Sequence, residues 1–108
     1  MPKGYLGVFE QMVLLAILRQ GDQAFGLEVR REIEASANRK VSRSAFYTTL
    51  DRLEKKGLVN WTSMESENAR RMAPIRLFEV TPDGLVALRE SRGVLEAAWR
   101  GMDEVVDG

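Results

Sequence analysis

The residues best suited to bind another molecule lie in one stretch, residues 42–57, which the sequence predicts to be a single helix. Its apolar residues Phe46, Leu50 and Leu53 recur at spacings of four and three, so one face of the helix is buried. The other face carries side chains that can hydrogen-bond to phosphates or to the edges of bases: Arg43, Ser44, Tyr47, Thr48 and Arg52. We therefore predict a DNA recognition helix.

The ends of this helix are marked by local signals. Ser42 suits the N-cap position, because its hydroxyl can accept from a backbone N–H one turn into the helix. Gly57 stands where the helix should end, directly after two lysines whose charges suit the negative end of the helix dipole. The first turns of a recognition helix normally enter the major groove, so residues 42–48 carry the strongest candidates.

Two of these residues leave alternatives open. Arg43 could donate two hydrogen bonds to a guanine edge or contact a phosphate. Tyr47 could bond a phosphate through its hydroxyl, or it could be a rim residue of the core. We favour the functional interpretation of Tyr47, because Phe46 beside it already fills the core position.

Composition argues against an enzyme. The 108 residues contain no Cys and no His, which removes thiolate metal sites, the commonest metal ligand and the commonest general base. We found no glycine-rich phosphate loop, carboxylate constellation or metal-ligand cluster, so we expect no catalytic site, no metal and no cofactor. Asp51 lies four residues before Lys55 and can pair with it, which argues against a catalytic carboxylate.

Charge is balanced overall but unevenly distributed. The chain has 16 basic and 16 acidic residues. Residues 39–76 hold nine Lys or Arg and four Asp or Glu, a net charge of +5, whereas residues 77–108 carry a net charge of −4. A local basic surface suits phosphate contact, although runs of charge are often only solvated faces. The longest apolar run, residues 12–18, is too short to span a membrane, and we expect a cytoplasmic protein.

The elements around the recognition helix follow from periodicity. We expect a loose arm at residues 1–7, a buried helix at residues 8–19 and a second helix at residues 26–37. Residues 38–41 link the second helix to the recognition helix, which makes a helix-turn-helix. Strands are predicted at residues 58–64 and 74–80, joined by a polar loop, and such a hairpin is a wing.

The basic residues around the helix and in the wing extend the predicted DNA-binding surface, whereas Trp61 in the first strand is assigned to packing. The basic residues added to the surface are Lys40, Arg70, Arg71 and Arg76.

A long terminal helix should follow. Thr81 suits its N-cap and Pro82 its first position, and the helix is expected to run to about Val105. Gly93 and Gly101 weaken it by about 1 kcal/mol each relative to Ala. Six apolar residues follow heptad spacing and form a narrow seam along this helix: Leu85, Leu88, Leu95, Trp99, Met102 and Val106. Arg92 occupies the one seam position that is not apolar.

This seam predicts a homodimer in preference to a helix folded back on its own core. Trp99 could line an apolar pocket for a flat ligand at the dimer interface. The alternative, which we favour, is that Trp99 is an ordinary interface anchor.

The expected fold is therefore mainly α with a small α+β part. It is a winged helix-turn-helix with three N-terminal helices, a two-stranded wing and a long C-terminal dimerisation helix. Residues 1–81 would form the DNA-binding domain and residues 82–108 the dimerisation helix.

Several segments together resemble the PadR family of bacterial transcription regulators. They are residues 13–22, Phe25-Gly26 (often Tyr-Gly in that family), residues 42–58 and residues 78–84, within a resemblance running from about residue 6 to residue 88. The resemblance implies a dimeric winged helix-turn-helix protein, most often a repressor, bound to a pseudo-palindromic promoter site. It also implies DNA contacts from the wing and from residues 42–44, 47 and 48.

The resemblance further implies release by phenolic acids, or binding of flat apolar compounds between the terminal helices, in some members. The chain departs from the family in the wing, where residues 69–76 keep the positive charge but lack the usual glycine. Two other functions stay open: a winged helix that binds a protein partner, and a small-molecule sensor with a pocket at the dimer seam.

Overall fold

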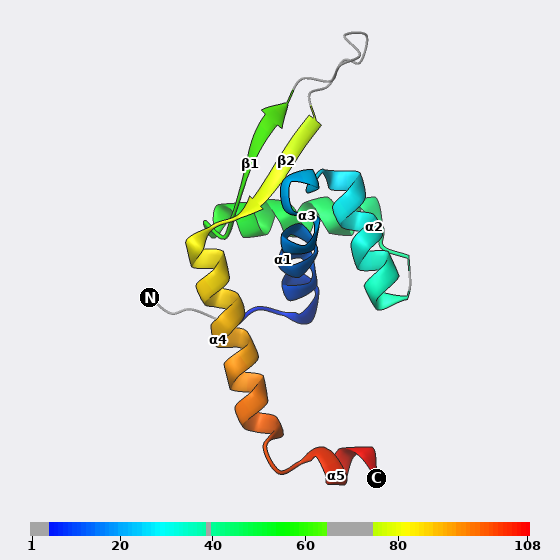
Figure 1. Cartoon of the computed structure of the whole chain (residues 1–108), viewed down its shortest axis with the longest axis vertical. Coiled ribbons are helices and arrows are strands. Elements are labelled where there is room, and N and C mark those ends of the chain that lie inside the picture. Colours follow the sequence, from blue (N-terminus) through cyan, green and yellow to red (C-terminus); the bar gives the residue numbers. More distant parts are fainter. Residues whose placement is uncertain (1–4, 39, 65–74) are drawn as a thin grey trace.

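The computed structural model describes residues 5–38, 40–64 and 75–108. In Figure 1 the N-terminal helices lie together, the hairpin stands above them and a longer helix leads away from them. In chain order the elements are α1 (Val8–Gln20), a short 3-10 helix (Gly21–Gln23), α2 (Gly26–Ala37), α3 (Arg43–Lys55), β1 (Val59–Met64), β2 (Ile75–Val80), α4 (Pro82–Trp99) and α5 (Asp103–Asp107). The predicted mainly helical fold with a two-stranded wing is confirmed. We call residues 5–80 the head and residues 82–108 the tail.

Both predicted ends of α3 are confirmed. The Ser42 hydroxyl accepts a hydrogen bond from the Ala45 backbone N–H at 3.0 Å. At the other end Gly57 adopts φ 76°, a left-handed conformation that glycine takes without steric cost. The N–H groups of Gly57 and Leu58 donate to the carbonyls of Glu54 and Leu53, both at 2.9 Å, which satisfies the last turn and directs the chain into β1.

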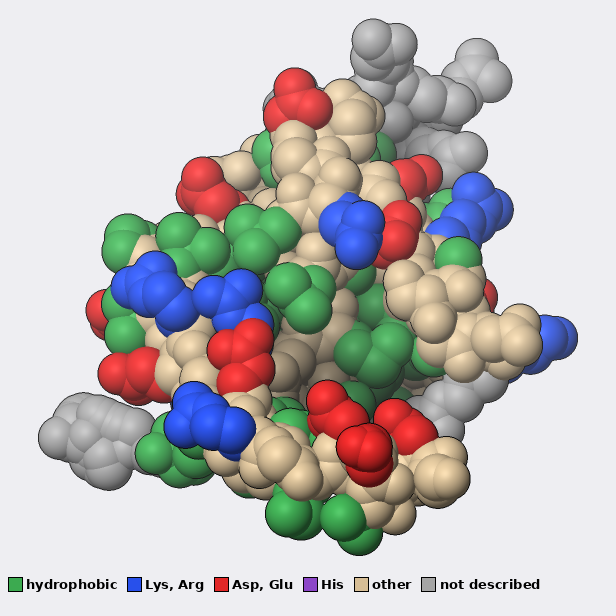
Figure 2. Space-filling view, turned by 60° about the horizontal axis from the view of Figure 1, so that its bottom comes forward, with side chains coloured by type: hydrophobic (Ala, Val, Ile, Leu, Met, Phe, Trp, Pro, Cys, Tyr) green, Lys and Arg blue, Asp and Glu red, His purple; other side chains and the backbone are tan. Residues whose placement is uncertain are grey.

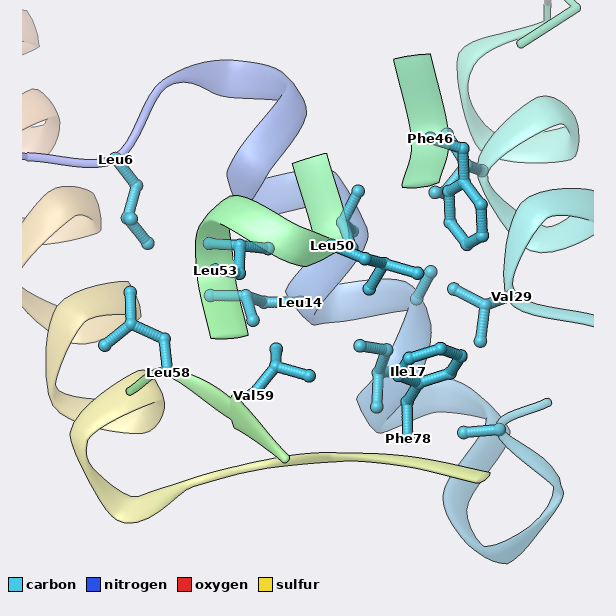
Figure 3. Packing of buried hydrophobic residues seen from close by; sticks show 14 residues of the cluster. Leu6, Leu14, Ile17, Val29, Phe46, Leu50, Leu53, Leu58, Val59 and Phe78 are labelled. Carbon is cyan, nitrogen blue, oxygen red and sulfur yellow. The ribbon is translucent and has the colours of Figure 1, made fainter. Parts of the chain in front are cut away.

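The core lies between α1, α2, α3 and the hairpin (Figure 3). Phe46, Leu50 and Leu53 of α3 are buried, as their spacing predicted. They meet the buried face of α1 and Val29 and Ile33 of α2, while Val59 and Phe78 close the core from the hairpin. The apolar face of α3 is therefore used for packing, and its opposite face is left exposed.

The hairpin is held against the start of α2. Strands β1 and β2 pair antiparallel, with Trp61 opposite Phe78 and Ser63 opposite Arg76. The Phe78 N–H donates to the Ala24 carbonyl at 2.9 Å, and Phe25 forms a bridge with Leu77. Strand β2 thus lies beside the first turn of α2, which brings the start of β2 close to the N-terminal half of α3.

A tight joint connects the head to the tail. The Thr81 hydroxyl accepts from the Gly84 N–H at 3.0 Å, which confirms the predicted N-cap, and it donates to the Gly57 carbonyl at 2.7 Å. The Thr81 N–H donates to the Leu58 carbonyl at 3.0 Å. A Cβ on Gly84 would collide with that same carbonyl oxygen and lie 2.7 Å from Val80 Cγ1, so α4 approaches the head as closely as glycine allows.

The prediction of a loose arm at residues 1–7 is wrong for its last part. Leu6 is buried, its N–H donates to Ser91 Oγ at 3.0 Å, and its carbonyl accepts from Gln11 Nε2 at 2.9 Å. These contacts fix the arm between α1 and α4. Residues 1–4 lie outside the described part of the chain.

The prediction of one continuous terminal helix to about Val105 is also wrong. Helix α4 ends at Trp99, and the short helix α5 begins at Asp103. Between them Gly101 adopts φ 79°, which cannot continue a right-handed helix. Gly93 is accommodated within α4, so only one of the two weakening glycines breaks the helix. None of the helices within the described ranges is long and apolar enough to cross a membrane.

Candidate nucleic-acid interface

The exposed side of α3 and the link before it carry most of the predicted DNA-binding residues. Lys40, Ser42, Arg43, Ser44 and Thr48 are all exposed. They belong to the first turns of α3 or immediately precede it, so the core contacts on the opposite side of the helix leave them accessible. The Ser42 hydroxyl accepts from the Ala45 N–H, and its own hydrogen remains free to point outward.

An open hollow of about 900 Å³ lies beside this surface. Three segments line it: the first turn of α2, the N-terminal half of α3 and the start of β2. The lining residues are Gln23, Phe25, Gly26, Leu27, Glu28, Arg43, Tyr47, Asp51, Ile75, Arg76 and Phe78. The fold thereby brings together three of the residues predicted from sequence, Arg43, Tyr47 and Arg76.

Each arginine of the hollow lies over an aromatic ring. Arg43 Cζ is 5.6 Å from the centroid of the Tyr47 ring, and Arg76 Cζ is 4.4 Å from that of Trp61. Neither arginine forms an ion pair with a carboxylate among residues 5–38, 40–64 and 75–108. A ring holds a guanidinium by its face and occupies none of its N–H donors, so both arginines can still donate to a phosphate or a base edge.

Tyr47 takes the core-rim position that was one of the two alternatives left open by the sequence, and it also lines the hollow. Its ring meets that of Phe46 edge to face, with centroids 5.0 Å apart and planes at 75°, and it packs against the core cluster. Its hydroxyl lies against Gly26, where any Cβ would collide with it. Tyr47 is therefore a rim residue of the core whose hydroxyl is held at the start of α2, inside the hollow.

The α2 wall of this hollow was not predicted from the sequence. Phe25 occupies the N-cap of α2, and no side chain caps the first turn of this helix. The dipole makes this end of a helix electropositive. The only signal was Phe25-Gly26, where a glycine opens the first helix of the helix-turn-helix. The carboxylates Glu28 and Asp51 also line the hollow and oppose an anion there.

A family model for the PadR-like transcriptional regulators matches residues 14–90, which run from the middle of α1 to the middle of α4 and include every segment of the hollow. The chain belongs to the PadR-like family. It is thus a DNA-binding transcription regulator and not an enzyme. No curated protein sequence matches the chain.

Solved structures agree with this PadR-like fold. A PadR-like transcription factor from Bacteroides fragilis is 25% identical with a TM-score of 0.66, over 94% of this chain and 88% of that one. A transcriptional regulator from Clostridium thermocellum is 18% identical with a TM-score of 0.69, over 88% and 89% of the two chains. A PadR-family regulator from Eggerthella lenta is 20% identical with a TM-score of 0.65, over 89% and 84%.

The three remaining predicted DNA-binding residues of this PadR-like protein are Arg52, Arg70 and Arg71. Arg52 lies toward the C-terminal end of α3, near Glu10 of α1. Burial raises the pKa of the Glu10 carboxyl, but the Gly7 N–H, the Lys56 ammonium and the more distant Arg52 charge outweigh burial and lower that pKa below its ordinary value. Arg70 and Arg71 lie outside the described residues.

The seam residues of the tail are mostly exposed. Figure 2 shows the face that carries α4 and α5, where hydrophobic side chains gather around a depression. Leu88 is the exception, because it packs partly against the core of its own head. The exposed members are Leu85, Leu95, Trp99, Met102 and Val106.

Proposed function

We propose that this PadR-like protein is a dimeric, sequence-specific repressor that binds an inverted repeat in a promoter. The observation that carries the proposal is the hollow beside the exposed first turns of α3, where Arg43 and Arg76 stand on two of the walls and each lies over an aromatic ring. The family membership supports DNA as the ligand.

The binding mode follows from the chemistry of each wall. The first turns of α3 enter the major groove, where Arg43 and Ser44 reach base edges. A backbone phosphate enters the hollow and accepts hydrogen bonds from Arg76, from the Tyr47 hydroxyl and from the N–H groups that open α2. Lys40, Ser42 and Thr48 flank this contact and bind neighbouring phosphates. Repression follows when the bound protein occludes the promoter.

The tail supplies the second copy that specific binding requires. One recognition helix reads too few base pairs, whereas two helices related by a two-fold axis read an inverted repeat. The exposed seam residues Leu85, Leu95 and Trp99 would be covered by the same residues of a partner. In this proposal residues 1–81 bind DNA and residues 82–108 dimerise.

A small aromatic or apolar effector fits the same interface. Trp99 is 44% exposed at the end of α4, where two terminal helices would enclose it. An effector between them would change the spacing of the two heads and release the DNA. In a Trp61→Phe background Trp99 is the only tryptophan, so tryptophan emission reports on it alone. A flat titration of this emission across a panel of planar aromatic compounds would count against the effector.

The central test is selection of bound duplexes from random DNA by the purified protein. We expect enrichment of an inverted repeat, with affinity that falls steeply as salt rises. Arg43→Ala should then weaken binding to the selected duplex by about tenfold or more, and should relax selectivity if Arg43 reads a base. Tyr47→Phe keeps the ring and the packing while removing only the hydroxyl.

The matched control is Arg89→Ala, which removes the same charge from an exposed position on α4. It should leave binding nearly unchanged. Wild-type affinity in the Arg43→Ala variant would show that the reading face is misplaced. Equal binding to all sequences would remove the proposed function and favour a protein partner for this winged helix.

A further inference from the structure

One face of the hairpin places Trp61 beside Arg76. Side chains alternate along a strand, and the register pairs Trp61 with Phe78 and Ser63 with Arg76, so all four side chains share a face. Phe78 is only 3% exposed and closes the core, which shows that this face turns toward the helices. Arg76 lies two residues farther along, nearer the tip of the hairpin, and is exposed.

Arg76 reaches back diagonally over the Trp61 ring. Its Cζ is 4.4 Å from the ring centroid, a distance at which the guanidinium is attracted to the π face. Trp61 itself is half-buried and packs against the core cluster, so the ring is a fixed surface. An unsupported arginine on an exposed strand loses much rotamer freedom when it binds, whereas a stacked arginine has already lost part of it.

The two residues differ in what they can reach. Arg76 lines the hollow together with Arg43 and Tyr47, and Trp61 is absent from its walls. The Trp61 ring lies against Arg76, which does line the hollow, so it can act on a molecule there by holding the Arg76 side chain. This separates Trp61 from the residues that contact DNA in the proposed function.

We propose that Trp61 is a positioning residue for DNA binding. Its ring holds the Arg76 guanidinium at the rim of the hollow, with the N–H donors free to meet a backbone phosphate in two-pronged geometry. The inference deepens the proposed function and rests on it. It assigns to Trp61, which looked from the sequence like a packing residue, a share in the affinity for DNA.

The test uses the labelled duplex recovered by the selection experiment and four variants of the full chain. Trp61→Leu removes the ring but keeps an apolar side chain, Trp61→Phe keeps a smaller ring, and Arg76→Ala removes the cation; the fourth variant combines Trp61→Leu with Arg76→Ala. Trp61→Leu should weaken binding about three- to fivefold, and Trp61→Phe should weaken it less. Circular dichroism and thermal unfolding establish whether each variant is folded. If Trp61→Leu does not fold, the same comparison is made with Trp61→Phe.

Two readouts separate positioning from a structural role. In the Arg76→Ala background the Trp61→Leu change should add no further loss of affinity, because the ring then has nothing to position. The salt dependence should also differ. Arg76→Ala should make the plot of log affinity against log salt less steep by roughly 1.8 for the dimer, since each protomer loses one phosphate contact, whereas Trp61→Leu leaves the charge in place and the slope nearly unchanged.

The possible outcomes are distinct. An equal loss from Trp61→Leu with and without Arg76 would overturn the positioning role, as would wild-type affinity in a folded Trp61→Leu variant. If Arg76→Ala binds like wild type while Arg43→Ala does not, the inference fails and the proposed function stands. If the wild-type protein selects no DNA sequence, both fail.

Discussion

The head and the tail of this PadR-like protein treat apolar residues in opposite ways. All the hydrophobic residues of the buried core cluster fall between Leu6 and Phe78, within the head. In α4 the buried residues are Gly84 and Ser91, and in α5 none is buried. Leu95 and Trp99 of α4, by contrast, are 48% and 44% exposed.

Because of this difference, the exposed surfaces of the head and the tail suit different kinds of partner. The head buries its apolar side chains and leaves exposed a polar face with cations, which suits a charged and hydrated partner such as DNA. The tail leaves an apolar stripe exposed, which suits a second protein surface. Helix α4 contacts its own head through Gly84, Ala87, Leu88 and Ser91, so the close approach uses mostly small residues and the larger ones remain available.

The largest expected effect comes from charging the seam. A Leu95→Glu, Trp99→Glu double variant would place four carboxylates in a two-fold interface, and the dimer dissociation constant should rise by about 100-fold or more. Binding to an inverted repeat should fall with it, because each half-site is then bound separately. Analytical ultracentrifugation and DNA titration measure the two effects, and thermal unfolding should show that the head remains folded.

The control for this variant lies on the same helix. Val86 is 40% exposed but lies about 100° around the helix from Leu85, away from the seam. Val86→Glu should leave the oligomeric state unchanged. A dimer that survives the double variant, or that Val86→Glu disrupts equally, would show that the tail does not associate through the seam.

A pair of glycines in α4 tests how firmly the head and tail are joined. Gly84→Ala should lower the free energy of unfolding by about 1–3 kcal/mol, because the new methyl group meets the Leu58 carbonyl and Val80 Cγ1. Gly93→Ala should raise it by up to about 1 kcal/mol, because a Cβ there meets nothing and alanine favours the helix. Denaturant unfolding measures both, and equal effects of the same sign would contradict the close joint.

The features that were predicted from the sequence depend on interactions between residues close together in the chain. Ser42, Gly57 and Thr81 act on neighbours within a few residues, so their capping roles could be read directly from the sequence. The burial of Phe46, Leu50 and Leu53 follows from periodicity alone. These local signals fixed the order of the elements and the exposed face of α3.

The missed features join segments far apart in the chain. The hydrogen bond from Leu6 to Ser91 spans 85 residues, and the hollow combines residues from α2, α3 and β2. The stack of Arg76 on Trp61 depends on the strand register, which a long hairpin loop leaves undetermined. Helix propensity alone could not predict that the helix breaks at Gly101, because Gly93 has the same propensity and lies within α4 without breaking it.

The contact between the N-terminal arm and the tail should contribute a smaller amount than the joint. Ser91 is 2% exposed, and Ser91→Ala would leave the buried Leu6 N–H without its acceptor. The expected cost is about 1–2 kcal/mol, with faster hydrogen exchange at the Leu6 amide. Ser36→Ala, at an exposed position on α2, is the matched control and should change neither quantity. Unaltered exchange at Leu6 in the Ser91 variant would show that the arm is held by other contacts.

The smallest expected effect concerns the stability that an ion pair contributes, and it compares one pair in the head with one pair in the tail. Glu10 Oε2 lies 3.0 Å from Lys56 Nζ, and the Glu10 side chain is only 12% exposed. The pKa of Glu10 is lowered in the folded protein, because the Gly7 N–H and Lys56 outweigh the effect of burial. A lowered folded pKa contributes stability above the unfolded pKa, about 4.3 for Glu, and that contribution is lost as pH falls through the folded value.

Glu10→Gln should therefore cost about 1 kcal/mol at pH 7, a modest amount because Lys56 is 47% exposed and the amide can still accept from Gly7. The difference between variant and wild type should shrink toward zero near pH 3. In the tail, Arg92 and Glu96 are both 69% exposed at 4.0 Å, so Glu96→Gln should produce no measurable change at either pH. If denaturant unfolding gave the two variants the same pH profile, the Glu10 pair would contribute no more than a solvated surface pair, and the link from α1 to the end of α3 would have to be maintained by packing alone.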